Sequence, residues 1–432
     1  MRIVPPVRGL PKLWPSKFFY GWAIVYASFL ISIAQVPMYG PVFSVFVKPI
    51  EDELGWSRST ITIAFTFGSI GGSLLSAVIG SVLDKYGART VTVIAGITVA
   101  SALFGIATMS EPWHFWIAYG IARSAALAGV SLGTSVAIAN WFIKNRGRAT
   151  AIRAMGQRGG QAIVPILIMP VLLILGWRES FAVLAVIALL FITLPAFFFI
   201  RRRPEDYGMV PDGIRINSVD KNESIDHEIS WDLKQVRKTR TLWMITIGMS
   251  AGIAAQIAIN VHAVANFQDQ GMSEGLSITI ASMFTGVAAV SMMGWGFLLD
   301  RIHVRHVSMI SMALFIISMF ILLYAESYAL ATLFAITFGV ATGGWTVSQM
   351  VMIPNYFGRM HAGSIKGFIS PVEGIIGISG PLIAAFLFDQ YGSYDLAFMG
   401  AAGAFCVGLI TFYFAKPLDP SKAVRVCPDE HR

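Results

Sequence analysis

The chain has 432 residues, of which 55% are hydrophobic and only 13% are charged, and its formal net charge is +8. Soluble globular domains carry about 25% charged residues, so this composition excludes an ordinary soluble enzyme, a disordered protein and a disulfide-stapled secreted domain. The basic residues lie between long apolar runs and not on one soluble face, which favours a lipid bilayer over nucleic acid as the partner.

Long apolar segments follow one another along the whole chain. A helix needs about 20 mostly apolar residues to cross a membrane. Twelve segments meet this requirement, at about 19–47, 60–83, 90–109, 113–142, 149–175, 180–200, 241–267, 276–299, 306–325, 328–356, 366–388 and 394–415. We therefore predict an all-α membrane protein with twelve transmembrane helices in two six-helix bundles, residues 1–200 and 241–416. A cytoplasmic linker, 201–240, joins them and a cytoplasmic tail, 417–432, follows.

The distribution of charge predicts the orientation of the chain. If the N-terminus is cytoplasmic, most of the 32 Lys and Arg residues lie in cytoplasmic segments, whereas the outer loops carry acids such as Glu51, Asp52 and Asp269. This asymmetry is typical of multi-pass proteins of the cytoplasmic membrane. We therefore expect both termini to be cytoplasmic.

The two halves repeat two motifs at equivalent positions. GSVLDKYGAR (80–89) after the second segment matches GFLLDRIHVR (296–305) after the eighth, and NWF (140–142) matches NYF (355–357). Matched pairs of this kind indicate internal structural repeats. In each loop an Asp at the cytoplasmic interface can meet an arginine and a helix N-terminus of the other half. We predict a gating latch there, and the alternative is an ordinary interfacial loop. The predicted gating residues are Asp84, Arg89, Asp300, Arg301 and Arg305.

The loop at 80–89 resembles the signature between helices 2 and 3 of the major facilitator superfamily, and the resemblance covers essentially the whole chain. The second copy differs, because His303 stands where the first has Gly87. Further segments resemble the bacterial branch related to monocarboxylate transporters and oxalate/formate antiporters. They are 39–59, 140–149, 176–181, 201–213 and 363–371. This resemblance implies the major facilitator fold, with two pseudo-symmetric bundles, and a small organic anion as substrate.

One departure limits what the resemblance implies. The animal monocarboxylate carriers have a Lys in helix 1 and an Asp/Arg pair within helix 8. Here the first segment has no charge before Lys48, and the eighth has none before Asp300. The proton-coupling residues of those carriers therefore cannot be assigned to this chain.

Three arginines lie within apolar segments, where a charge costs at least about 2.5–3.5 kcal/mol. Arg123 resembles the helix 4 arginine of the superfamily, and it either binds a substrate carboxylate or ties neighbouring helices together. Arg158 lies among glycines and between Gln157 and Gln161, so we predict that these three residues bind substrate. Arg153 lies nearer the cytoplasmic end, and we expect it to snorkel to the interface.

Other polar groups at membrane depth are weaker candidates. Glu373 either takes up a coupling proton or is a fixed partner of a basic residue. His262 is a second proton-coupling candidate, and the alternative is a histidine with satisfied hydrogen bonds or one in contact with water. Tyr39 and Gln256 are predicted to line the substrate cavity, because the first and seventh helices border the cavity in the superfamily.

The motifs indicate a transporter and not an enzyme. The chain has no Walker loop, no HExxH and no CxxC pair, so we predict no enzyme activity, no cofactor and no metal. We predict a secondary transporter that moves a mono- or dicarboxylate by alternating access, as a proton symporter or an anion exchanger, and acts as a monomer. Arg123 and Arg158 would hold the carboxylate. The alternatives are an exporter of drugs or other small molecules on the same fold, and a membrane sensor that does not transport.

Overall fold

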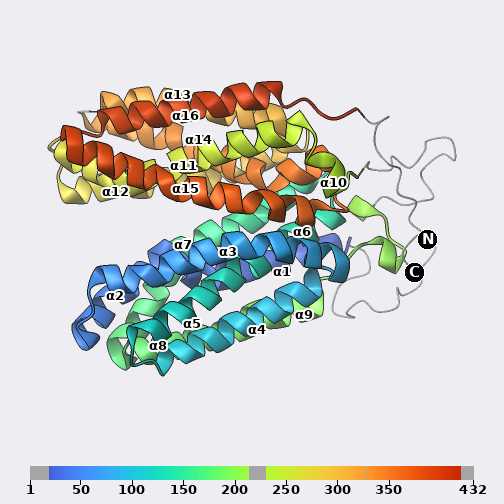
Figure 1. The fold of residues 1–432 in the computed structure, drawn as a ribbon, viewed down its shortest axis with the longest axis horizontal. Helices are drawn as coiled ribbons and strands as arrows, with labels where there is room; N and C mark the ends of the chain where they lie inside the picture. The colour runs from blue at the N-terminus through green and yellow to red at the C-terminus, as the bar shows by residue number, and fades with distance from the viewer. Residues whose placement is uncertain (1–18, 214–229, 326, 420–432) are drawn as a thin grey trace. The chain divides into compact units, whose positions relative to one another are not determined.

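The computed structural model describes residues 19–213, 230–325 and 327–419 (Figure 1). Within these ranges the regular elements are all helical, and eleven helices are long and apolar enough to span a membrane. The middle of the predicted linker, the end of the predicted tail and the first residues of the predicted N-terminal bundle lie outside the described residues. The bundle boundaries 1–200 and 241–416 stay a prediction.

The chain groups into two compact units. Unit 1 contains residues up to Glu228 together with Arg359–Pro371, and unit 2 contains Ile229–Gly358 and the residues from Val372 onward. The main helices of unit 1 are α1 (Gly21–Ala34), α2 (Gly40–Leu54), α3 (Arg58–Tyr86), α4 (Ala88–Ala107), α5 (Pro112–Ala125), α6 (Leu132–Trp141), α7 (Arg146–Leu175), α8 (Trp177–Ala188) and α9 (Leu194–Phe199). Here α3 packs on α5, α4 packs on α5 and α8, and α1 packs on α7.

Unit 2 has the corresponding helices of the second half. They are α11 (Arg240–Asp269), α12 (Glu274–Leu299), α13 (Val304–Leu323), α14 (Tyr328–Phe357), α15 (Ala362–Tyr391) and α16 (Asp395–Phe414), preceded by the short α10 (Leu233–Val236). In this unit α14 packs on α12 and α13, and α16 packs on α11 and α13. The first turns of α15 belong to unit 1, and the helix continues into unit 2 after Pro371.

The first predicted span is not a continuous helix. The prediction of one helix over 19–47 is wrong, because α1 ends at Ala34, a 3₁₀ turn covers Val36–Met38, and α2 begins at Gly40. Between them, Tyr39 is extended, with φ −110° and ψ 155°. Pro37 supplies the cause, since a proline has no N–H to donate and disfavours a helical residue before it. The fourth and sixth predicted spans are helical throughout, but each contains a π-helical turn, at Ala126–Ser131 and Leu189–Thr193.

The internal repeat is visible in contacts that each half makes within itself. The last arginine of each loop motif stacks on an aromatic ring near the end of its half: Arg89 Cζ lies 4.5 Å from the Phe197 ring centroid, and Arg305 Cζ lies 5.6 Å from that of Tyr413. Arg305 also donates hydrogen bonds to the carbonyl oxygens of Phe412 and Tyr413. A cation that binds the last carbonyls of a helix stabilises its C-terminus.

The second repeated motif makes a matching contact. In unit 1, Trp141 Nε1 donates a 3.1 Å hydrogen bond to the Arg201 carbonyl, just beyond α9. In unit 2, Tyr356 Oη donates a 2.7 Å hydrogen bond to the Ala415 carbonyl, just beyond α16. Both aromatic residues are the central residue of the N-[Trp/Tyr]-Phe motif. The two sequence motifs therefore mark the same pair of anchoring contacts in each half.

A segment that follows α9 is anchored to the start of α7 by one carboxylate. Asp212 accepts hydrogen bonds from the backbone N–H groups of Ile143, Lys144 and Asn145, at 2.8, 2.8 and 3.0 Å, and from Asn145 Nδ2 at 2.9 Å. Its own backbone has φ 62°, a left-handed conformation that Asp tolerates better than most residues. These N–H groups precede α7, so the carboxylate caps that helix.

We expect Asp212→Ala to destabilise the protein by about 1–3 kcal/mol, because several backbone donors lose their acceptor at once. Thermal unfolding of the purified protein in detergent measures this effect. Asp206→Ala is the matched control, since Asp206 is exposed and lies in the same segment. Equal melting temperatures for the two variants would contradict the assigned cap.

Candidate functional site

The break in the first span places two backbone carbonyls beside α5. Met38 O accepts a hydrogen bond from Arg123 Nη1, and Pro37 O accepts one from Tyr119 Oη at 3.3 Å. Irregular backbone is tolerated at membrane depth only where its polar groups find partners inside the protein or in a water-filled cavity. The Arg123 and Tyr119 side chains therefore supply donors that the interrupted helix lacks.

Arg123 is buried among groups that fix its position. Nε donates a 2.9 Å hydrogen bond to Ser69 Oγ on α3, and Cζ lies 3.5 Å from the centroid of the Phe65 ring. A Cβ at Gly68 would lie 2.6 Å from Arg123 Cβ, so the glycine makes room for the arginine. Within the described ranges Arg123 has no carboxylate partner, and its Nη2 has no acceptor.

Arg158 lies on α7, on the side away from α1. Gly156 and Gly160 bring α7 against the first span, because a Cβ at Gly156 would lie 2.6 Å from the Phe29 carbonyl oxygen. Arg158 is two residues from Gly156, about 200° around the helix, so it faces away from that contact. Its guanidinium is partly buried, and it has no hydrogen bond or ion pair with the residues that the structure describes.

Tyr39 lies beside Arg123 and within electrostatic range of Arg158. Its ring centroid lies 6.0 Å from Arg123 Cζ. Tyr39 reaches this position because the extended backbone at the break redirects the chain. We call the set Tyr39, Arg123 and Arg158 the arginine site.

The two predicted glutamines lie on the same helix as Arg158. Gln157 and Gln161 on α7 are partly buried and make no hydrogen bond to other described residues. Their amides are therefore available donors and acceptors near the arginine site.

Arg153 does not snorkel, and that expectation is wrong. The side chain is 0% exposed. Its Nε donates a 2.8 Å hydrogen bond to Thr134 Oγ1, and Nη2 donates 3.0 Å hydrogen bonds to the carbonyl and hydroxyl oxygens of Ser131. Ser131 ends the π-helical turn, where backbone hydrogen bonding is irregular. Acceptors from a neighbouring helix therefore hold the charge inside the protein.

The other residues predicted to bind substrate or a coupling proton lie in unit 2. Gln256 is buried, and its Nε2 has no hydrogen-bond partner among the described residues. Glu373 is 7% exposed. His262 Nδ1 lies 3.2 Å from Tyr394 Oη, and its Nε2 lies 3.1 Å from the Pro381 carbonyl oxygen, so both ring nitrogens have partners. This arrangement fits the alternative of a histidine with satisfied hydrogen bonds.

The first loop motif meets a helix N-terminus. The Asp84 carboxylate accepts hydrogen bonds from the backbone N–H groups of Gly363 and Ser364, at 3.1 and 2.8 Å, and from Ser364 Oγ at 2.5 Å. The backbones approach closely, because a Cβ at Gly367 would lie 2.1 Å from the Ser76 carbonyl oxygen. Asp84 therefore caps the start of α15, where a negative charge is favourable.

The other predicted gating residues are placed differently. Arg89 and Arg305 make the anchoring contacts within their own halves that are described above. Asp300 follows the last residue of α12, and the Arg301 side chain is exposed. Arg202 Nη2 donates a 3.4 Å hydrogen bond to the Asp84 carbonyl, so an arginine meets the backbone and not the carboxylate of this loop.

We expect Asp84→Asn to lower stability by about 1–2 kcal/mol, because the amide loses the charge at the helix N-terminus and one acceptor oxygen. Thermal unfolding in detergent measures the loss. Asp389→Asn, an exposed acid near the other end of α15, is the control. An unchanged melting temperature for Asp84→Asn would show that the cap contributes nothing.

Several contacts of the site were not predictable from the motifs. Sequence reasoning missed Ser69 and the Met38 carbonyl as partners of Arg123, and it missed Asp212 as the cap of α7. The proline at position 37 was the available signal for the break. No local pattern pairs Asp212 with residues almost 70 positions earlier in the chain. Across the described ranges, no group of three or more His, Cys, Asp or Glu residues is arranged to hold a metal ion.

Comparison with known proteins identifies the group to which the chain is similar. A family profile described as the Major Facilitator Superfamily matches residues 27–279 and 248–429. The chain is 22% identical to human monocarboxylate transporter 7, over 92% of this chain and 86% of the relative. It is 23% identical to a nitrite extrusion protein of Bacillus subtilis, over 85% and 88%. It is also 23% identical to a probable sulfoacetate transporter of Cupriavidus necator, over 87% and 89%.

A solved structure has the same fold. The proton:xylose symporter XylE superposes with a TM-score of 0.71 and 16% identity, and the match covers 91% of this chain and 95% of that one. At this identity the likeness concerns the fold alone. It agrees with the predicted all-α architecture of two six-helix bundles.

Proposed function

The chain belongs to the Major Facilitator Superfamily, and from this premise we propose that it is a secondary transporter of a small organic anion, a mono- or dicarboxylate. The relatives named above are transporters, and their names refer to monocarboxylate, nitrite and sulfoacetate, all of them small anions. The bacterial relatives and the multiple spans support a place in the cell membrane. We further propose that both termini are cytoplasmic and that the protein acts as a monomer.

The observation that carries the proposal is the arginine site. Arg158 is a guanidinium at membrane depth with no partner among the described residues, and Arg123 has a nitrogen without an acceptor. A charge in this position is costly unless something pairs with it. A carboxylate supplies two oxygens that match the fork of a guanidinium, so an organic anion is the partner that this chemistry favours.

We propose that substrate binding neutralises the repulsion between Arg123 and Arg158. The empty site holds two cations near Tyr39, and a bound carboxylate replaces their repulsion with two attractive contacts. Gln157 and Gln161 would supply hydrogen bonds that distinguish one anion from another, and Gln256 in unit 2 stays a separate candidate for substrate binding. The loaded transporter would then change between its two access states, and we propose that Asp84 and the Asp300 loop act as gating latches.

Two coupling modes remain within this proposal. In proton symport, Glu373 takes up the coupling proton. In anion exchange, a second anion occupies the arginine site on the return step, and no proton is needed. His262 is the second candidate for the proton site, and both of its ring nitrogens have hydrogen-bond partners.

Uptake into proteoliposomes tests the proposal. Purified protein is reconstituted and screened with radiolabelled mono- and dicarboxylates, sulfoacetate, nitrate and nitrite, with and without an inward proton gradient. We expect accumulation of a carboxylate above protein-free vesicles. Stimulation by the gradient would assign symport, and stimulation by internal anion would assign exchange.

The same assay separates the alternatives. Transport of cationic or neutral drugs without transport of any acid would favour an exporter on this fold. Binding of an acid without flux would favour a sensor. Transport of nitrate or nitrite alone would support the proposed anion site but would contradict a carboxylate as the substrate.

A further inference from the structure

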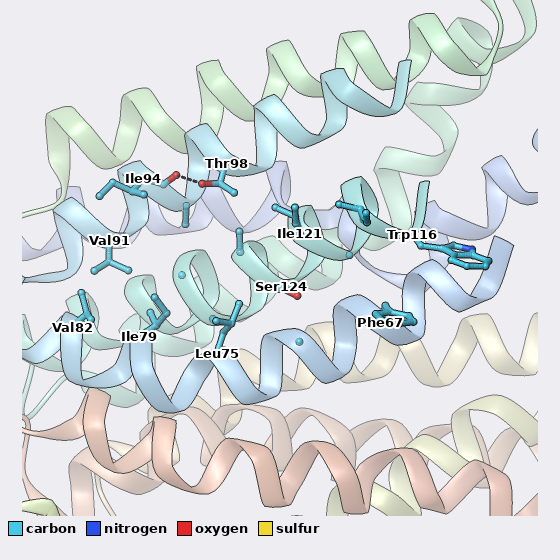
Figure 2. Close-up of a pocket in the computed structure, with 17 residues that line it drawn as sticks. Phe67, Leu75, Ile79, Val82, Val91, Ile94, Thr98, Trp116, Ile121 and Ser124 are labelled. Atoms are coloured by element: carbon cyan, nitrogen blue, oxygen red, sulfur yellow. Dashed lines mark hydrogen bonds between the residues drawn. The ribbon is translucent and has the colours of Figure 1, made fainter. Parts of the chain in front are cut away.

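An apolar groove runs along one face of unit 1, between α3, α4 and α5. Its volume is about 480 Å³, within the range of about 300–1,000 Å³ typical of ligand sites. Figure 2 shows the lining side chains, with Val82 and Val91 at one end and Phe67 and Trp116 at the other. The groove is therefore elongated along the helices.

The lining offers almost nothing to a polar ligand. The two hydroxyl groups in it are already bonded to their own or a neighbouring helix, because Thr98 Oγ1 donates to Ile94 O at 2.9 Å and Ser124 Oγ donates to Gly68 O at 3.2 Å. The side chains around them are apolar and well exposed, such as Ile94 at 59% and Ile121 at 46%. All three helices are membrane spans, so a flexible apolar chain suits this groove.

The end at Val82 has a different chemistry. Lys85 and Tyr86 continue the α3 face one turn beyond Val82, and Thr90 precedes Ile94 by one turn on α4. All three side chains are exposed, and Lys85 Nζ lies 5.1 Å from the Tyr86 ring centroid. In the described part of the chain Lys85 has no acidic partner. The nearby Asp84 carboxylate is bonded to the start of α15.

Trp116 lies at the opposite end of the groove (Figure 2). Trp116 Nε1 donates a 2.8 Å hydrogen bond to the Thr60 carbonyl, which ties α5 to α3. The groove therefore has an apolar trough, a fixed aromatic end and one cationic, hydroxyl-bearing end at the turn between α3 and α4.

We propose that this groove binds one anionic phospholipid. An acyl chain lies along Leu75, Ile79 and Ile94, and the phosphate binds the Lys85 ammonium and the hydroxyl groups of Tyr86 and Thr90. Charge complementarity selects this occupant, because an apolar trough that ends in an unpaired cation matches a chain that ends in an anion. With the orientation proposed above, the lipid belongs to the cytoplasmic leaflet. The groove is separate from the arginine site, so lipid binding there does not depend on which anion is transported.

Native mass spectrometry of the full chain tests the proposal, using phosphatidylglycerol and phosphatidylcholine as probes. We expect the wild-type protein to retain about one phosphatidylglycerol through delipidation and to prefer it at least about tenfold over phosphatidylcholine. Lys85→Ala should remove that preference, and Lys85→Arg should keep most of it. Equal retention of both lipids by the wild-type protein would overturn the headgroup assignment.

A groove-filling variant tests the acyl chain. A Cβ at Gly120 would lie 3.7 Å from Phe67 Cβ, an ordinary contact, so Gly120→Leu is expected to fold and to fill the groove. Gly400→Leu on α16 is the matched control, because a Cβ there meets nothing within 4 Å. We expect Gly120→Leu to lose at least about tenfold of the bound phosphatidylglycerol while the control retains it.

A phosphatidylglycerol with a diazirine-labelled acyl chain gives an independent readout that needs no variant. Crosslinks to α3, α4 and α5 near Leu75 and Ile94 are the expected result. Crosslinks spread over all helices, equal lipid retention by Gly120→Leu and Gly400→Leu, or a dimer seated on this face in place of lipid would each overturn the proposal.

Discussion

Replacing Arg158 with alanine is expected to reduce transport of the anionic substrate by about 10- to 100-fold while the protein remains folded. The side chain has no hydrogen bond or ion pair with the described residues, so its removal leaves no buried acceptor unsatisfied. It would remove the cation proposed to bind the carboxylate, and hydrogen bonds to charged groups contribute about 1.5–3 kcal/mol. The effect should therefore appear in substrate affinity and not in the melting temperature.

Substrate binding to purified protein and uptake into proteoliposomes measure the Arg158 effect, and thermal unfolding provides the stability comparison. Arg158→Lys should be intermediate, because an ammonium keeps the charge but not the two-pronged geometry of a guanidinium. Arg58→Ala is the control, since Arg58 is an exposed residue paired with Glu51. Wild-type uptake by Arg158→Ala would remove this residue from the site.

Replacing Arg123 with alanine is expected to have a different signature, in which stability falls together with transport. Arg123 donates to Met38 O at the break in the first span and to Ser69 Oγ on α3. Its loss leaves a carbonyl at membrane depth without a donor and a void beside Gly68. We expect a loss of about 2–4 kcal/mol, because unsatisfied buried groups and cavities both destabilise.

Arg123→Gln separates the structural role from the charge. The amide can still donate to one of the two acceptors, so this variant should recover part of the stability but not the transport. Unfolding in detergent and uptake after reconstitution are the two measurements. Full stability of Arg123→Ala would show that the contacts at the break contribute nothing, and full uptake by a stable Arg123→Gln would show that its charge is not needed.

The comparison between these arginines shows how far sequence reasoning could go. All three stood out because charges are rare in apolar segments. Their roles were not local properties. Arg153 was expected at the interface, but it is completely buried because Ser131 and Thr134, on a neighbouring helix, accept its hydrogen bonds. Arg158 has no hydrogen bond or ion pair with the described residues, and its role in substrate binding stays a prediction.

The loop motifs give a second example. The sequence predicted that Asp84 meets a helix N-terminus, and the structure places its carboxylate on the backbone of Gly363 and Ser364. The role of this contact in gating stays a prediction. Arg89, the arginine of the same motif, is also a predicted gating residue, and its guanidinium stacks on the Phe197 ring. The motif therefore combines residues that serve two different contacts.

By itself the sequence determined the class of protein, its all-helical membrane architecture and the duplication of the two halves. These features follow from the lengths of apolar runs and from repeated short motifs. A membrane-spanning helix satisfies its backbone hydrogen bonds within itself, so its own local sequence is enough to identify it. The tertiary structure decided which polar groups pair, where the first span breaks and where the groove lies. Those features depend on which helices pack together, and residues such as Asp84 and Gly363 are too far apart in the chain for any local pattern to join them.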